Sequence, residues 1–149
     1  MINKETCFNF CQSFVKQRLS RIQNNITSIQ EALTSETKSS AGDKHETGRA
    51  MLQLEREKLG QQLAEAEKMK HTLAKVDISK STEFVQLGSL VITSKANYFL
   101  AISAGEFKNE EVSAFCISIQ TPIGQLLLGK AKDDVILFNG TEIIIAEII

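Results

Sequence analysis

Five side chains of the kinds that bind zinc are spread along the chain. They are Cys7, Cys11, Cys116, His45 and His71. Cys7 and Cys11 lie one helical turn apart, but the histidines fall at opposite ends of a later segment. A structural zinc site needs four converging ligands, which this distribution does not provide. We therefore expect the cysteines to be small core residues and His45 to be solvated, with a contact to substrate phosphate as its alternative role.

Two acidic residues, Asp43 and Glu46, lie three positions apart in the stretch Gly42-Asp43-Lys44-His45-Glu46. An aspartate at the N-cap with a glutamate three residues later makes a capping-box-like start for a helix. Both negative charges also suit the positive end of the helix dipole. The local sequence therefore predicts that a helix begins here and holds two carboxylates on a rigid mount.

The chain lacks the motifs of an independent enzyme. It contains no Gly-x-Ser-x-Gly sequence, no phosphate-binding glycine loop and no Cys/His cluster with metal-ligand spacing. Its formal net charge is −1, so no global positive field attracts nucleic acid. No run is apolar enough to span a bilayer, and an odd count of three cysteines does not suit a secreted disulfide framework. We expect a cytoplasmic protein that does not itself catalyse a reaction.

The first half of the chain, residues 1–76, predicts a helical hairpin. Apolar residues recur with a period near 3.5, which is typical of a coiled-coil seam. The two seams are Cys11, Val15, Leu19, Ile22, Ile26, Ile29 and Leu33, then Leu52, Leu59, Leu63, Ala66, Leu73 and Val76. Folding the chain about residue 42 sets Leu33 near Leu52, Ile22 near Leu63 or Ala66, and Val15 near Leu73. Thirty residues at ~1.5 Å each make a rod of roughly 45 Å, with its tip near residues 39–46.

The second half predicts a small antiparallel sheet with one short helix. Strand-like runs cover residues 85–93, 98–102, 114–119, 134–138 and 142–148. Asn139-Gly140 is a strong signal for a type I′ hairpin turn. Thr121 can cap a helix that Pro122 begins and Gly129 ends. Residues 77–83 form the expected linker, and residues 84–149 the second domain. We expect Phe8, Phe10 and Phe14 to pack against that domain.

Two stretches resemble the Gre family of bacterial transcript-cleavage factors. The first runs from Ile117 through Thr121-Pro122-Ile123-Gly124 and the Leu-rich helix to Gly129-Lys130 and Asp133-Asp134-Val135. The second is the tip sequence at residues 42–46. Gly88-Ser89-Leu90-Val91 and residues 142–148 resemble the opening and closing strands of the family's C-terminal domain. The resemblance implies an α+β protein, an N-terminal antiparallel coiled-coil hairpin followed by an FKBP-like domain that docks on RNA polymerase.

The same resemblance implies a role for the tip. In Gre factors the hairpin enters the secondary channel of RNA polymerase, and tip carboxylates help to hold the second Mg²⁺ and orient the water that cleaves backtracked RNA. Asp43 would be the metal ligand, and Glu46 would position the water or support the ligand. The Mg²⁺ is shared with the polymerase active site and is not expected to bind the isolated protein. Nascent RNA is contacted only within that complex, DNA there is a further possible contact, and a monomer is expected.

Two positions depart from the family pattern. Where cleavage factors usually carry another acidic residue and an aromatic one, this chain has Arg49 and Ala50. Arg49 removes negative charge from the tip and could contact phosphate. Lys16, Arg18, Arg21, Arg56 and Lys58 could track RNA, although interspersed acids favour a solvated helix face. The alternatives are a Gre-like channel regulator that does not stimulate cleavage, and a coiled-coil assembly module that pairs with a second chain.

Overall fold

The protein consists of two compact units, seen here in a computed structural model. The structure describes the backbone of residues 1–38 and 42–149, and the side chains of residues 1–35 and 46–149. One unit, here called the sheet unit, contains Met1–Phe14 and Lys70–Ile149, and the other, the hairpin unit, contains Val15–Met69. The sheet unit therefore includes one end of each long helix. The two units are described separately below.

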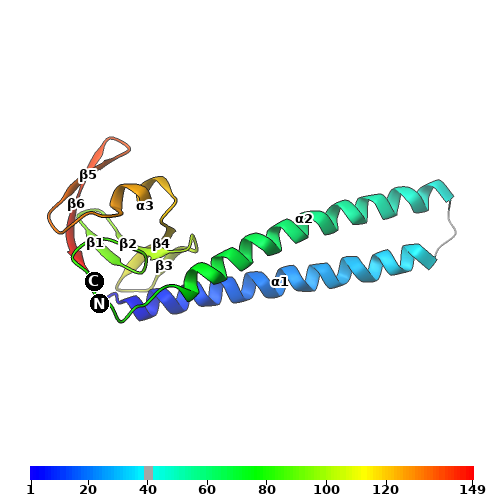
Figure 1. Cartoon of the computed structure of the whole chain (residues 1–149), viewed down its shortest axis with the longest axis horizontal. Coiled ribbons are helices and arrows are strands. Elements are labelled where there is room, and N and C mark those ends of the chain that lie inside the picture. The colour runs from blue at the N-terminus through cyan, green and yellow to red at the C-terminus, as the bar shows by residue number, and fades with distance from the viewer. Residues whose placement is uncertain (39–41) are drawn as a thin grey trace. The chain divides into compact units, whose positions relative to one another are not determined.

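Two long helices make up most of the first half of the chain. Helix α1 spans Lys4–Lys38, and α2 spans Gly42–Ala74 and runs back beside α1 (Figure 1). The predicted antiparallel hairpin is confirmed. Every described residue of the two predicted seams is buried or half-buried. The most enclosed members are Cys11, Val15, Ile22, Leu59, Ala66 and Leu73. No helix in the described part of the chain has the length and apolar character needed to cross a bilayer.

A contact between the helices agrees with the register expected from the sequence. Arg18 Nη1 lies 3.7 Å from Met69 Sδ. Arg18 falls between Val15 and Ile22, while Met69 falls between Ala66 and Leu73. Along the hairpin, this contact therefore lies between the two predicted pairs Val15–Leu73 and Ile22–Ala66. The spacing of apolar residues was enough to set the register because each helix has only one apolar stripe.

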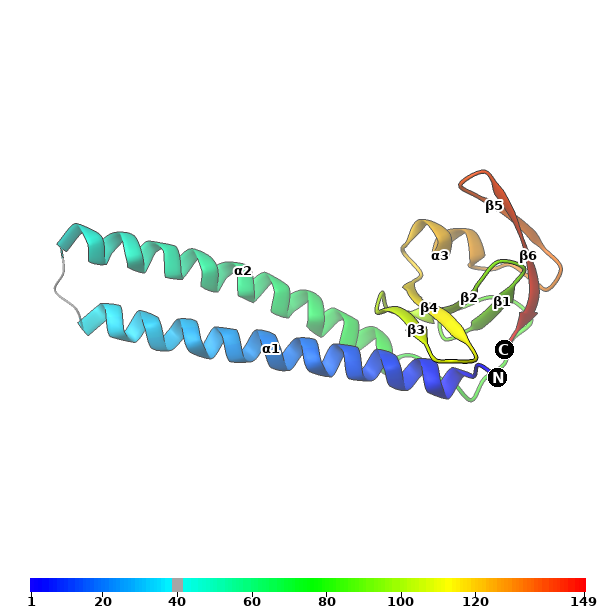
Figure 2. The same ribbon diagram turned by 180° about the vertical axis from the view of Figure 1, so that it is seen from behind.

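The second half forms a six-stranded sheet with the strand order β3-β4-β2-β1-β6-β5 (Figure 2). The strands are β1 (Leu90–Thr93), β2 (Asn97–Ala101), β3 (Gly105–Lys108), β4 (Ser113–Ser118), β5 (Val135–Phe138) and β6 (Thr141–Ile148). A short helix, α3 (Pro122–Leu127), lies between β4 and β5 in the sequence. Neighbouring strands are antiparallel except β2 and β4, which are parallel. The predicted α+β class is confirmed.

The sheet differs from the sequence prediction in two ways. Strand β3 was not predicted, because its sequence Gly-Glu-Phe-Lys contains one apolar residue and its side chains face mostly solvent. This extra strand reverses the chain, so β4 runs parallel to β2 and not antiparallel to it. The run predicted at residues 85–93 is also interrupted. Gly88 has a φ of 90°, and a turn from Gln86 to Ser89 delays strand β1 until Leu90.

The predicted turn and cap are confirmed. Asn139 and Gly140 have φ values of 50° and 77°, which is the positive pair that a type I′ turn requires between β5 and β6. Thr121 accepts a hydrogen bond from Gly124 N through its hydroxyl, and Pro122 begins α3. Gly129, with a φ of 80°, follows the helix and donates to Val85 O at 2.8 Å. The cap at Thr121 and the hydrogen bond from Gly129 to Val85 fix the two ends of α3.

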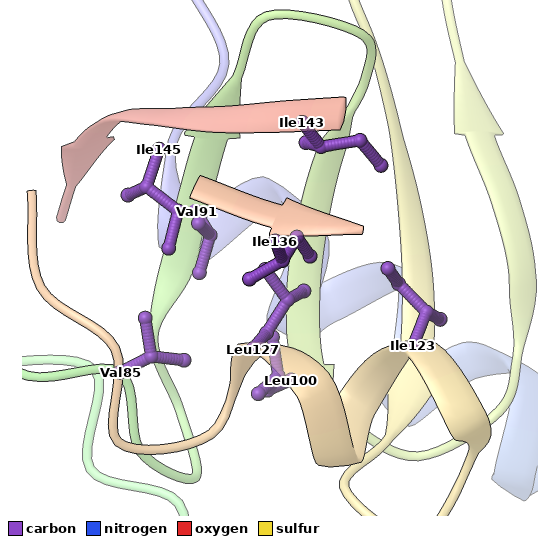
Figure 3. Close-up of a cluster of buried hydrophobic side chains, with 8 residues drawn as sticks. All are labelled: Val85, Val91, Leu100, Ile123, Leu127, Ile136, Ile143 and Ile145. Atoms are coloured by element: carbon purple, nitrogen blue, oxygen red, sulfur yellow. The ribbon is translucent and has the colours of Figure 1, made fainter. Parts of the chain in front are cut away.

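The core of the sheet unit lies between α3 and one face of the sheet. Figure 3 shows side chains from strands and helix directed toward one another in this layer. The cluster consists of Val85, Val91, Leu100, Ile123, Leu127, Ile136, Ile143 and Ile145. Each member is at most 8% exposed. Close packing of this kind makes the core sensitive to the loss of even a few methylene groups.

Candidate functional site

The predicted carboxylates lie at the start of α2. The helix begins at Gly42, so Asp43 is its second residue and does not precede it. The side chain of Asp43, like that of His45, lies outside the described residues, and so does its predicted capping hydrogen bond. Glu46 is described and is exposed to solvent within the first turns of α2. Its carboxylate therefore stands at the turn end of the hairpin, near the positive end of the helix dipole.

Arg49 joins the two helices near this end. Its Nη1 donates a hydrogen bond to Leu33 O at 3.1 Å, and the side chain is half-buried. A hydrogen bond from a charged donor is stronger than one between neutral groups. At least one guanidinium donor is thus directed across the hairpin, a contact that the sequence did not predict. The predicted contact of Arg49 with phosphate stays a prediction.

Glu46 is the described carboxylate of the predicted pair at this end of the hairpin. Carboxylate oxygen is the ligand type that Mg²⁺ prefers, and the ion commonly takes one or two carboxylates while other groups complete its octahedron. Within the described residues, no group of three or more His, Cys, Asp or Glu side chains could hold a metal ion. The role of Glu46 as a ligand of a shared metal ion stays a prediction.

The basic residues of the hairpin are interspersed with acidic residues. Lys16, Arg18, Arg21 and Lys58 are exposed, and Arg56 is half-buried. Glu55 and Glu57 are also exposed on α2, so positive and negative charges alternate along this helix. This is the arrangement of an ordinary solvated helix face.

An apolar surface covers the outer side of the β5–β6 hairpin. It consists of Val135, Leu137 and Ile144, which are 54%, 63% and 46% exposed, and we call it the β5–β6 surface. Val135 pairs with Ile144 across the two strands, and β5 is an edge strand. The intervening residues Ile136 and Ile143 are buried in the core instead. The sequence does not predict this surface, because both faces of the hairpin are apolar and the pattern does not reveal which face is covered.

The N-terminal part of α1 packs on the sheet through Phe10, as predicted, whereas the same packing of Phe8 and Phe14 stays a prediction. The rings of Phe10 and Phe107 meet edge to face with centroids 5.7 Å apart. Cys7, Cys11 and Cys116 are all buried, which confirms that they are core residues. The sequence did not predict that Cys116 contacts the two helical cysteines.

Comparisons with known proteins do not assign the chain to a family. No protein-family model matches the chain, and no curated protein matches it. Among solved structures, the chain is similar to the protein in "Structure of the transcription factor Gfh1", with 20% sequence identity. The match covers 90% of this chain and 90% of that chain, with a TM-score of 0.36. A score this low does not establish a common arrangement of the whole chain.

Proposed function

We propose that this protein is a transcription elongation factor that binds bacterial RNA polymerase and stimulates cleavage of backtracked RNA. It would act in the cytoplasm as an accessory factor and not as an independent enzyme. The observation that carries the proposal is the exposed Glu46 carboxylate in the first turns of α2, at the turn end of a long hairpin. The tip sequence with Asp43 and the C-terminal stretch from Ile117 to Val135 support it through their resemblance to Gre factors.

The hairpin would bring its carboxylates to the polymerase active centre. Asp43 would supply an oxygen ligand to the second Mg²⁺, and Glu46 would hold the attacking water by hydrogen bonding. Bound magnesium stabilises the attacking and leaving oxygens of a phosphoryl displacement. The position of both residues at the start of a helix suits this role, because positioning contributes to catalysis only when the groups are held in place.

The sheet unit would provide the docking contact. The β5–β6 surface presents three large apolar side chains on an edge hairpin. Exposed apolar patches of this kind often mark protein–protein contacts. Glu142 lies opposite Leu137 in the strand pairing and supplies a polar rim. We therefore place the polymerase contact on this surface.

The cleavage step is tested with stalled, backtracked RNA polymerase. Wild-type protein should increase the rate of RNA cleavage, and Asp43→Asn with Glu46→Gln should reduce the increase by at least about tenfold, because the lent oxygens lose their charge. Glu57→Gln is the matched control, because Glu57 is also an exposed carboxylate of α2 but lies three helical turns from Glu46. Equal stimulation by wild type and the double variant would refute the carboxylate role.

The docking surface is tested with two leucines of nearly equal exposure. Leu137 on β5 is 63% exposed and Leu54 on α2 is 62% exposed. The Leu137→Asp variant should no longer bind to immobilised polymerase, whereas the Leu54→Asp variant should bind like the wild type. If Leu137→Asp binds as tightly as the wild type, the β5–β6 surface is not the polymerase contact.

Two other functions each have one observation in their favour. Arg49 and Ala50 replace the acidic and aromatic residues of cleavage factors, which favours a channel regulator without cleavage. Such a protein would compete with other channel binders and leave cleavage rates unchanged. Met51 and Leu54 are 68% and 62% exposed beside each other on α2, which favours pairing with a second chain. Light scattering that finds a dimer in the wild type and a monomer in Leu54→Asp, without polymerase binding, would support that function.

A further inference from the structure

Three buried cysteines from two distant parts of the chain meet inside the sheet unit. Cys7 and Cys11 are on α1, and Cys116 is on β4. Their exposed fractions are 0%, 0% and 1%. None of them forms a disulfide in this structure. The group is called the thiol cluster below, and neither the proposed function nor the resemblance uses it.

The cluster follows from how α1 lies on the sheet. Phe10 of α1 packs against Phe107 of β3, and Phe107 pairs with Ala114 of β4. Ala114 and Cys116 are two residues apart on β4, so their side chains point to the same face of the sheet. Both are 1% exposed, whereas Phe115 between them is 38% exposed on the other face. Helix α1 therefore covers the face that carries Cys116.

Cys116 interacts with both helical cysteines. Hydrogen bonds link its side chain to Cys7 and to Cys11. The hydrogen bond with Cys116, followed by burial, raises the pKa of the Cys7 thiol far above its usual range. The hydrogen bond with Cys11, together with burial, raises the pKa of Cys116 to about 12, against the opposing effect of the hydrogen bond with Cys7. Both groups are thus neutral thiols at physiological pH, which makes the closed cluster slow to react because the thiolate is the nucleophile.

We propose that the thiol cluster is a redox-sensitive staple, in which oxidation joins Cys116 to Cys7 or Cys11 and ties α1 covalently to β4. The oxidant is a low-molecular-weight disulfide such as oxidised glutathione. One cysteine loses its proton and attacks the oxidant, which forms a mixed disulfide and releases one glutathione thiol. A second cysteine then attacks that mixed disulfide and releases the other glutathione thiol. Two protons and two electrons pass to the oxidant in total.

Geometry limits which pairs can form. Side chains four residues apart on a helix have Cβ atoms about 5–6 Å apart, whereas a disulfide needs about 3.5–4.5 Å. Cys7 and Cys11 therefore cannot join each other while α1 is intact. Cys116 interacts with both helical cysteines, so we expect it to join either one, and the remaining thiol can then exchange the bond between the two positions. The same three thiols do not suit a zinc site, which requires a fourth ligand.

The first turn of α1 controls access to the cluster. Asn3 caps this turn, because its Oδ1 accepts a hydrogen bond from Thr6 N at 2.8 Å. Lys4 is 8% exposed and its Nζ donates to Lys80 O. Burial lowers the pKa of Lys4, and the nearby Asp77 carboxylate opposes that effect. Brief opening of this turn would let the oxidant reach Cys7 and let the thiol ionise, and the disulfide with Cys116 would form once the turn has closed again on β4. The rate of oxidation should therefore depend on how tightly the turn is held.

The test is oxidation of the folded full-length protein by oxidised glutathione, followed by alkylation, intact mass and non-reducing peptide mapping. Wild type, Cys7→Ala and Cys11→Ala should each form one intramolecular disulfide that includes Cys116. Cys116→Ala should form none, although it keeps two cysteines. The oxidised wild type should melt about 5 °C or more above the reduced form, and dithiothreitol should reverse the shift.

A second variant tests the access route without changing any cysteine. Asn3→Ala removes the cap and should speed oxidation about fivefold. Asn25→Ala is the matched control, because Asn25 is an exposed asparagine further along α1, and its rate should match the wild type. The proposal is overturned if Cys116→Ala oxidises as completely as the wild type, or if the wild-type disulfide forms only in urea. Thermal melting of each reduced variant establishes that it is folded before oxidation.

Discussion

The sheet unit and the hairpin unit bury their apolar residues in different ways. In the sheet unit, Leu90, Leu100 and Leu127 are each 0% exposed within layers of strands and helix. In the hairpin unit, the most enclosed residues lie on one stripe, and toward the turn end the seam residues Ile29 and Leu33 are only half-buried. A single stripe stabilises a helix pair without covering its other faces. The stability of the hairpin comes from its apolar stripe. Polar groups at the turn end can therefore stay exposed to solvent without destabilising the hairpin.

The largest expected effect compares one buried leucine from each unit. Leu127→Ala should cost about 3–4 kcal/mol, because Leu127 is fully enclosed and leaves a cavity. Leu59→Ala should cost about 2 kcal/mol, because the hairpin stripe is open at its sides and can relax. The two losses are measured by urea unfolding. Tyr98 fluorescence reports on the sheet unit, and far-UV circular dichroism reports on the helices as well. Equal losses would mean that both units are packed alike.

Replacing two glycines by alanine should give the next largest changes in stability, one a loss and the other a gain. A Cβ at Gly124 would fall on the backbone carbonyl oxygen of Ser118, so Gly124→Ala should cost about 2 kcal/mol. At Gly60, in the middle of α2, the nearest atom is the flexible Arg56 Nη1 at 3.3 Å. Gly60→Ala should therefore stabilise the hairpin by about 0.5–1 kcal/mol through helix propensity. Thermal melts of both variants test the pair, and a destabilised Gly60→Ala would contradict the open-stripe description.

The Cys116 thiol should give the sheet unit a pH dependence. The pKa of Cys116 is raised to about 12 from 9.0. Its protonated form is therefore favoured by folding, and the stabilisation is complete below pH about 9 and is lost as the pH rises toward 12. We expect a loss of about 1 kcal/mol by pH 10, measured by urea unfolding under reducing conditions. Cys116→Ala should lack this part of the slope, and an unchanged slope would remove Cys116 as its source.

The smallest effect is expected at the turn end of the hairpin. Arg49→Ala removes the hydrogen bond to Leu33 O and should cost about 0.5–1 kcal/mol. Hydrogen exchange should speed up around Leu33 and Arg49, while the sheet unit stays protected. Arg21→Ala is the control, because Arg21 is exposed on α1. If both variants exchange alike, the contact of Arg49 does not hold the helices together.

Local signals allowed much of the fold to be predicted. The heptad spacing from Cys11 to Val76 set the hairpin, and Asn139-Gly140 and Thr121-Pro122 placed a turn and a helix start where they are found. Each of these depends on residues close in the sequence. Strand β3 escaped prediction because Glu106 and Lys108 leave it without an alternating apolar pattern. The parallel pairing of β2 with β4 is a consequence of that strand.

The candidate site was predictable only in part. Glu46 was identified from its spacing to Asp43 and from the family resemblance, and its exposure agrees with that role. The Arg49–Leu33 contact depends on how two helices meet, and the spacing of Arg49 alone does not reveal it. The thiol cluster is a stronger example, since Cys116 reaches Cys7 and Cys11 only after α1 packs on β4. Side-chain convergence of this kind is a tertiary property.

The position of β6 in the sheet has a consequence for the order of synthesis. β6 lies between β1 and β5, and Leu90 and Ile149 exchange backbone hydrogen bonds of 3.2 and 2.8 Å. The helices of the hairpin unit make mainly contacts between residues that leave the ribosome early. The sheet, in contrast, cannot be completed until β6 emerges. During translation, the hairpin would therefore be present beside an unfinished sheet whose strand β1 still lacks one neighbour.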